Sequence, residues 1–295
     1  MKHFLALEGF SLDASRDILT RAAVFKRDRK IGGAHLKPLL GQTWALIFTK
    51  SSTRTRVSFE VGIRELGGES LFLSSNDIQL GRGEPIRDTA RVLGRMTHGA
   101  VIRTYAQADV VEFSEFGKIP TVNALTDEEH PCQVLTDVFT YEEKRGSIAG
   151  KRVAFIGDAA CNMGRSWAYA AQIFGFDIVF AAPKGYECPV SGPRIFQTTS
   201  CAEAAAGADL LYTDVWVSMG KEAESAQRLA DMAPYQINAA LLALAKPDAL
   251  VLHCLPAYRG KEITEEVMEA RAQDIFDQAE NRLHVQKGVL DWLVS

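Results

Sequence analysis

The sequence alternates along most of its length between short apolar segments and longer amphipathic segments with helical spacing. Apolar runs of four or five residues predict buried strands, and spacing of three to four predicts helices. The predicted strands are residues 44–48, 70–73, 100–103, 121–124, 153–156, 178–181, 210–213 and 249–253. The predicted helices include residues 11–27, 57–66, 85–96, 131–144, 163–174, 264–271 and 279–293. This alternation predicts parallel sheets covered by helices on both faces, the α/β class.

The 295 residues suit two domains better than one large sheet, and a glycine-containing break at residues 146–150 lies near the middle of the chain. We therefore expect two doubly wound parallel-sheet domains. The first is predicted to span residues 1–136 and the second residues 137–274, with the connecting helix at the boundary. The C-terminal helix, residues 275–295, has no strand after it, and we expect it to pack back on the first domain.

Composition excludes several classes of protein. A net charge of −4 argues against a nucleic-acid surface, which needs concentrated Lys and Arg. No apolar run approaches the ~20 residues of a membrane-spanning helix, and the first ten residues do not resemble a secretory signal. Five cysteines without a spaced framework fit a reducing cytoplasm. The absence of Cys-x-x-Cys and His-x3-His argues against a structural zinc.

The segment Phe-Thr-Lys-Ser-Ser-Thr-Arg-Thr-Arg carries an apolar strand into a helix start at residues 48–56. The first turn of a helix offers unpaired N–H groups and the positive end of the helix dipole. Ser52, Thr53 and Thr55 add hydroxyl donors, and either Arg54 or Arg56 can add a planar fork that matches two phosphate oxygens. A capping serine beside solvated arginines is the plainer interpretation. Three hydroxyls and two arginines at a strand end nevertheless favour a site for a doubly charged anion.

Other polar residues follow predicted strands at the edge where parallel sheets bind ligands. Arg103 ends one strand, although a lone arginine there is more often an interface residue. His130 precedes a proline, which is favoured at the first helical position. The helix dipole then keeps the imidazole neutral, so that it can donate to a carbonyl oxygen gaining negative charge. Capping alone is the simpler explanation of this histidine.

The second half of the chain offers groups for a small zwitterion. Asp214 follows a strand and suits an ammonium, and Ser218 in the next loop suits a carboxylate. Asn162 is a plausible contact, but its loop lacks Gly-x-Gly-x-x-Gly, which disfavours a dinucleotide. Cys254 ends a strand abruptly and suits proton handling or orientation. Arg282, in the last helix, is by itself explained as a solvated side chain.

Together these motifs resemble the aspartate/ornithine carbamoyltransferase family, in family order and over nearly the whole chain. The matching segments are Ser-Thr-Arg-Thr-Arg at 52–56, the Gln79 loop, Arg103-Thr104, His-Pro-Cys-Gln at 130–133, Gly-Asp-Ala-Ala-Cys-Asn-Met-Gly at 157–164, Asp-Val-Trp-Val-Ser-Met-Gly at 214–220, His-Cys-Leu-Pro at 253–256 and Glu-Asn-Arg at 280–282. The Ser-Met-Gly loop resembles the ornithine-using members, and the Gln79 loop has no lysine of the aspartate-using kind.

The resemblance implies carbamoyl transfer from carbamoyl phosphate to the δ-amine of ornithine, giving citrulline and phosphate for arginine biosynthesis, without a metal or other cofactor. It implies a cytoplasmic homotrimer with a site in the cleft between the carbamoyl phosphate-binding first domain and the ornithine-binding second domain, reached by a neighbouring subunit's Gln79. The implied carbamoyl phosphate residues are Ser52, Thr53, Arg54, Thr55, Gln79, Arg103, His130, Gln133, Cys254, Leu255 and Arg282. The implied ornithine residues are Asn162, Asp214, Ser218 and Met219. Arg103, His130 and Cys254 are implied to take part in catalysis.

Two positions depart from the family pattern. Cys161 stands where the first of two asparagines is common, and Arg165 where a small polar residue is frequent. Three alternatives stay open: a sister carbamoyltransferase acting on another amine, a nicotinamide-dependent oxidoreductase, and a catalytically silent relative that serves as a binding or assembly subunit. The sequence fits either a biosynthetic or a degradative direction.

Overall fold

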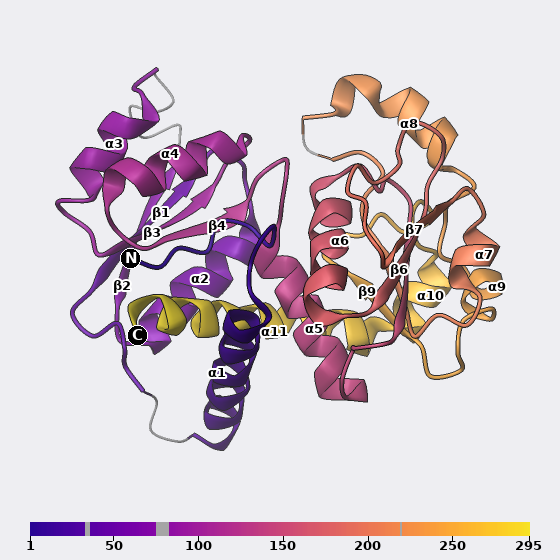
Figure 1. Cartoon of the computed structure of the whole chain (residues 1–295), viewed down its shortest axis with the longest axis horizontal. Helices are drawn as coiled ribbons and strands as arrows, with labels where there is room; N and C mark the ends of the chain where they lie inside the picture. Colours follow the sequence, from indigo (N-terminus) through magenta and orange to yellow (C-terminus); the bar gives the residue numbers. More distant parts are fainter. Residues whose placement is uncertain (33–35, 75–82, 219) are drawn as a thin grey trace. The chain divides into compact units, whose positions relative to one another are not determined.

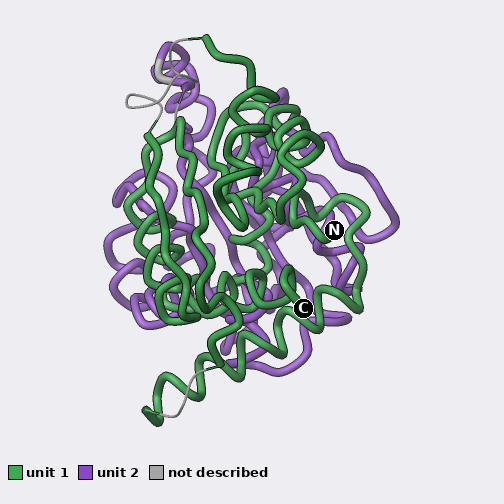
Figure 2. Tube along the Cα trace, turned by 90° about the vertical axis from the view of Figure 1, so that its left-hand side faces the viewer, with its two compact units in different colours: residues 1–136, 280–295 green, residues 137–279 purple. Residues whose placement is uncertain are grey.

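The structure is a computed structural model that describes residues 1–32, 36–74, 83–218 and 220–295 (Figure 1). The chain separates into two compact units (Figure 2): unit 1 comprises residues 1–136 and 280–295, and unit 2 comprises residues 137–279. Each unit contains a parallel sheet with helices on both faces. The prediction of two parallel-sheet α/β domains is therefore confirmed.

Unit 1 is built on a four-stranded sheet in the order β2-β1-β3-β4. Its strands are β1 (Thr43–Phe48), β2 (Glu69–Ser74), β3 (Gly99–Arg103) and β4 (Thr121–Leu125). Its helices are α1 (Leu12–Ile31), α2 (Thr53–Glu65), α3 (Ile86–Leu93) and α4 (Gln107–Gly117), with the start of α5 (Pro131–Arg145) and the end of α11 (Ala272–Val294). The order places β1 and β3 at the centre, so their carboxyl ends have neighbours on both sides.

The two faces of this sheet pack against different helices. One core consists of Ala45, Ile47, Ala90, Ala100, Ile102, Val110, Phe113 and Ile119, which join β1 and β3 to α3 and α4. Side chains alternate along a strand, so Leu46 and Val101, both fully buried, face the opposite side. Helices α1, α2 and α11 lie on that side (Figure 1). Burial on both faces explains why the sequences of these strands are almost continuously apolar.

Unit 2 is built on a five-stranded sheet in the order β7-β6-β5-β8-β9. Its strands are β5 (Arg152–Ile156), β6 (Asp177–Ala181), β7 (Ile195–Thr198), β8 (Leu210–Thr213) and β9 (Leu250–His253). Its helices include α6 (Asn162–Phe174), α7 (Cys201–Ala205), α8 (Ser225–Met232), α9 (Ala239–Leu242) and α10 (Glu265–Ala270). Here β5 and β8 are central, and their carboxyl ends lead to residues 157–162 and 214–220.

The sheet of unit 2 also has a core on each face. Alternate residues of β5, such as Ala154 and Ile156, pack in an aliphatic cluster with α7, α9 and α10. The intervening Phe155 instead stacks on Tyr212 of β8, with ring centroids 5.5 Å apart, and Tyr212 meets Trp167 of α6 at 5.1 Å. The sheet therefore has one aliphatic face and one aromatic face, and α6 covers the aromatic one.

All eight predicted strands are present, with ends that differ by at most one residue. The prediction missed β7, an edge strand of only four residues, Ile-Phe-Gln-Thr, whose Phe196 is 48% exposed. It also missed α4 and the short helices α7, α8 and α9, and it began the last helix at residue 279 although α11 begins at Ala272. Within the described residues, none of the helices has the length and hydropathy of a membrane span.

Candidate active site

The segment from β1 into α2 forms the expected helix start. Ser52 has an extended backbone and caps α2, since its Oγ accepts a hydrogen bond from the N–H of Thr55 at 3.2 Å. The Nε of Arg54 is buried and has no hydrogen-bond partner among the residues that the structure describes. Capping explains Ser52 but not Arg54. The neighbouring Arg56 is partly exposed: its guanidinium carbon lies 3.6 Å from the ring centroid of Phe72, and its Nε pairs with Glu60 at 2.9 Å.

Strand pairing brings the ends of β1, β3 and β4 together. Phe48 of β1 is in register with Arg103 of β3, and Arg103 is in register with Leu125 of β4. The N–H of Thr49 donates to the carbonyl oxygen of Arg103 at 2.9 Å. Arg103 thus ends the middle one of three adjacent strands, and the segments that carry Ser52 and His130 start from the strand ends on either side of it.

Arg282 of α11 joins this group from the far end of the sequence. Its Nη2 donates to Oγ1 of Thr55 at 2.5 Å, and the two residues are 3% and 1% exposed. The structure thus does not support the simple explanation of Arg282 as a solvated side chain. Thr55, Arg103 and Arg282 place hydroxyl and guanidinium groups near the start of α2.

His130 lies directly before α5 and is buried. Its pKa is lowered well below the usual 6.5, chiefly by burial and further by the positive charges of Arg282 and Arg103. The ring is therefore neutral near pH 7. The sequence analysis attributed neutrality to the helix dipole, whereas burial is the larger cause here. Gln133, one turn into α5, is also fully buried.

One ion pair at this edge of the sheet was missed by the sequence analysis. Lys50, 5% exposed, forms a short ion pair with Asp127, and its Nζ lies 4.3 Å from the ring centroid of Tyr105. Lys50 lies within the anion motif itself, so its position gave a signal. Its partners come from the ends of β3 and β4 and cannot be identified without the strand order.

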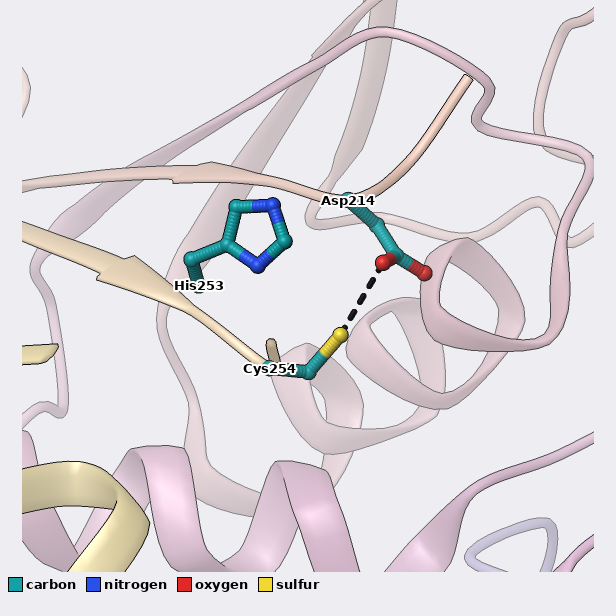
Figure 3. Close-up of side chains that lie close together, drawn as sticks. All are labelled: Asp214, His253 and Cys254. Atoms are coloured by element: carbon teal, nitrogen blue, oxygen red, sulfur yellow. Dashed lines mark hydrogen bonds between the residues drawn. The ribbon is translucent and has the colours of Figure 1, made fainter. Parts of the chain in front are cut away.

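In unit 2, Asp214 and Cys254 come together at the carboxyl ends of β8 and β9, where Thr213 is in register with His253. The Sγ of Cys254 donates to Oδ1 of Asp214 at 3.0 Å (Figure 3). The pKa of Cys254 is raised well above its usual value, first by burial and then by the negative charge of Asp214. Cys254 is therefore a protonated thiol that orients Asp214, not a thiolate nucleophile.

His253 and Glu262 brace the loop that carries Cys254. The Nδ1 of His253 accepts from the N–H of Leu255 at 2.8 Å, so the proton is on Nε2, which donates to Glu262 at 3.1 Å. Both groups are fully buried, and the sequence analysis did not identify Glu262. Asp214, His253 and Cys254 are close enough to suggest a metal site. Both ring nitrogens of His253 are already engaged, so this cluster does not present a free imidazole ligand.

The ornithine residues expected from the sequence lie on neighbouring loops of unit 2. Asn162 is the first residue of α6, and Cys161 is its N-cap without a side-chain capping bond. Burial, followed by the charges of Asp158 and Asp214, raises the pKa of Cys161 well above its usual value. Ser218 is half-buried in the loop after β8. Gln79 and Met219 lie outside the described residues.

A buried ion pair beside these loops also escaped the sequence analysis. Nη1 of Arg228, on α8, contacts Oδ2 of Asp158 at 2.7 Å, and its Nε contacts Glu224 at 2.8 Å. Burial raises the pKa of Asp158, while Arg228 opposes this shift. The pair connects the loop after β5 to the helix that follows the Ser218 loop.

Family models match both parts of the chain. The model described as "Aspartate/ornithine carbamoyltransferase, carbamoyl-P binding domain" matches residues 2–143, and the model described as "Aspartate/ornithine carbamoyltransferase, Asp/Orn binding domain" matches residues 149–293. The chain therefore belongs to the aspartate/ornithine carbamoyltransferase family.

Individual relatives point to one branch of this family. The chain is 54% identical to the ornithine carbamoyltransferase of Akkermansia muciniphila, covering 100% of this chain and 99% of the relative. It is 47% identical to the anabolic ornithine carbamoyltransferase of Pseudomonas aeruginosa, covering 100% of this chain and 98% of the relative. The crystal structure of anabolic ornithine carbamoyltransferase from Campylobacter jejuni matches with 42% identity and a TM-score of 0.93, over 99% of each chain.

The buried histidines predict how stability depends on pH. The pKa of His130 lies well below 6.5 in the folded state, and that of His284 falls to about 4, in both cases chiefly through burial. An unfolded chain binds these protons near pH 6.5, whereas the folded chain does not. The free energy of unfolding should therefore fall as the pH drops from about 6.5 towards 4, and less steeply in His130→Gln. Urea unfolding across this range at constant ionic strength measures both slopes, and equal slopes would contradict the prediction.

Proposed function

We propose that this protein transfers the carbamoyl group of carbamoyl phosphate to the δ-amine of L-ornithine, giving L-citrulline and phosphate. The observation that carries the proposal is the group of arginines around the start of α2, with Thr55 and the neutral His130 beside them. Together with the family assignment, this group suits a dianion whose neighbouring carbonyl must be polarised. The aspartate-using branch is disfavoured because the relatives compared above are named for ornithine.

The reaction has two places where negative charge grows. The lone pair of the neutral amine attacks the carbonyl carbon, which places charge on the carbonyl oxygen. The C–O bond to phosphate then breaks with its electron pair, and the amine loses one proton. We assign Arg103, His130 and Thr55 to the carbonyl oxygen. A neutral imidazole N–H can donate a hydrogen bond to this oxygen while keeping its proton. We assign Arg54 and Arg282, with the N–H groups at the start of α2, to the phosphate.

The remaining residues of the first domain complete this assignment. Ser52 holds the helix start in place, and Thr53 and Gln133 are assigned to further contacts with carbamoyl phosphate. The chemistry needs no metal or organic cofactor, because phosphate is a good leaving group and its charge is met by guanidinium groups. Closure after carbamoyl phosphate binds is part of the proposal, since excluding water prevents hydrolysis.

The residues of unit 2 are assigned to ornithine in the same active site. Asp214 pairs with the α-ammonium, and Ser218 and Met219 hold the α-carboxylate. Asn162 adds a polar contact at the start of α6. Cys254 and Leu255 are assigned to contacts with the reacting groups, and the thiol keeps Asp214 oriented. The side chain of Cys161 accepts no capping hydrogen bond, yet α6 still begins at Asn162, so a cysteine at this position leaves Asn162 at the helix start.

The assembly and the cellular role are also part of the proposal. We expect a cytoplasmic homotrimer whose active sites are shared through Gln79. The edge strand β2 supports a subunit contact, because Leu71 of β2 is 49% exposed and Val57 of α2 is 53% exposed. The direction is arginine biosynthesis, in keeping with relatives from P. aeruginosa and C. jejuni that are named anabolic.

Arg54 tests the phosphate assignment. Arg54→Lys keeps the charge but removes the planar fork, so activity should fall by roughly 10²–10³ as for the loss of one aimed donor. Steady-state rates and the KM for carbamoyl phosphate measure the effect. Arg56→Lys, on the exposed face of the same helix, is the matched control and should keep normal activity. Equal activities in the two variants would remove Arg54 from the site.

Asp214 tests the choice of amine. Loss of a buried charge partner costs about 2–5 kcal/mol, so Asp214→Asn should raise the KM for ornithine roughly thirtyfold or more and change that for carbamoyl phosphate little. Asp177→Asn, at the start of β6, removes a surface ion pair with Arg194 and is the control. The parent should use putrescine and N-acetylornithine poorly in the same phosphate-release assay. Turnover of either amine as fast as ornithine would favour the sister-enzyme alternative.

Subunit mixing tests the shared site. An inactive Arg54 variant and an inactive Gln79 variant should regain activity when subunits are exchanged, because some sites then receive both normal residues. Light scattering establishes the trimer, and each variant exchanged with itself is the control. A monomer, or no recovered activity after verified exchange, would contradict the shared site.

A further inference from the structure

Arg282 reaches the start of α2 from α11, a helix that belongs to another part of the sequence. The hydrogen bond from Arg282 to Thr55 exists only if α11 is held at one position along α2. The contacts between these helices therefore bear on carbamoyl phosphate binding as well as on stability.

Helices α1, α2 and α11 pack closely enough to resist sliding along one another. A Cβ on Gly62 of α2 would lie 3.3 Å from Cγ of Lys287 and 3.5 Å from Cδ1 of Leu283, both on α11. A Cβ on Gly288 of α11 would lie 2.5 Å from the carbonyl oxygen of Ile18 on α1. Side chains of α11 thus lie directly on the backbone of α2, while α1 supports α11 from another side.

A buried ion pair ties α11 to the far end of α2. Nζ of Lys287 contacts Oε2 of Glu65, the last residue of α2, at 2.7 Å, and the lysine side chain is 1% exposed. Glu65 also accepts from Arg29 of α1 at 2.9 Å. Lys287 is five residues after Arg282, or about 7.5 Å along the helix. The two helices are therefore joined at both ends of α2, by Arg282 at the start and by Lys287 at the end.

The residue next to Arg282 is held as well. Nζ of Lys26 on α1 donates to Oδ1 of Asn281 at 2.7 Å in a buried contact.

The charge of Lys287 needs its own explanation. An apolar side chain of the same size would fill the space between α11 and α2 without the cost of burying a charge. A buried ion pair adds direction to the contact, and a direction fixes the register between two helices.

We propose that Glu65 and Lys287 are a positioning pair, which sets α11 along α2 and so holds Arg282 at the phosphate end of the carbamoyl phosphate site. The pair touches no substrate and acts through Arg282. This inference rests on the proposed function, because it assigns Arg282 to phosphate.

Lys287→Met tests the pair, because it keeps the side-chain stem over Gly62 and removes the charge. The Kd for carbamoyl phosphate, measured by calorimetry without an amine, should rise about tenfold, as expected when a small displacement weakens an aimed contact. The KM for ornithine at saturating carbamoyl phosphate should change less than twofold. Lys287→Arg keeps a positive charge that can pair with Glu65, and this variant should bind carbamoyl phosphate nearly as well as the parent.

Asp291→Asn is the matched control. It breaks an ion pair of α11 with Arg21 of α1, 2.7 Å long, without touching α2. This variant should lower the melting temperature and leave the Kd for carbamoyl phosphate unchanged. Glu65→Gln combined with Lys287→Met should weaken binding no more than Glu65→Gln alone, because Glu65→Gln removes the contact with Lys287 as well as the one with Arg29.

Three results would overturn the positioning role: an unchanged Kd in folded Lys287→Met, an equal loss in Asp291→Asn, or additive losses in the double variant. Failure of the proposed function is a separate result. It would appear as no carbamoyl phosphate binding, or no turnover of ornithine, in the parent itself.

Discussion

The parallel register of β1, β3 and β4 is the constraint on which the rest of unit 1 depends. Because the strands run in one direction, the segments that follow them begin side by side, and residues from distant parts of the sequence become neighbours. Positive groups gathered in this way repel one another. The neutral ring of His130 adds a donor there without adding a charge, and the hydroxyl of Thr55 accepts one of the guanidinium N–H groups. The arginines can therefore be held ready for an anion.

Unit 2 applies the same geometry to a different charge problem. The register of β8 with β9 places Asp214 beside Cys254, and two anions at that distance would repel. Burial keeps the thiol protonated, so the contact is a hydrogen bond from Cys254 to Asp214 and not a repulsion between two anions. The pair His253–Glu262 fixes the loop from the other side. In both units, burial sets the protonation state of a key side chain: it keeps His130 neutral in unit 1 and Cys254 protonated in unit 2.

Much of this arrangement could be predicted because its signals are local. Strand and helix alternate in short periodic segments, and five consecutive residues, 52–56, are enough to predict the start of α2. What could not be predicted depends on partners far apart in sequence. Lys50, Arg228 and Glu262 are residue types that usually face solvent, and only strand order and loop paths bring them to Asp127, Asp158 and His253. The edge strand β7 was missed for a related reason, since half-exposed edges have weak apolar patterns.

The path of the last helix has a consequence for synthesis of the protein. Helix α11 begins in unit 2 and ends in unit 1, where it contributes Arg282. Residues 1–136 of unit 1 are translated first, whereas its α11 segment, residues 280–295, follows the whole of unit 2 along the chain. A nascent chain can thus fold the sheet of unit 1 early, but it lacks Arg282 beside Thr55 until translation has passed unit 2. The proposed anion site is therefore completed only after unit 2 has been made, and a premature stop before residue 282 removes Arg282 from it.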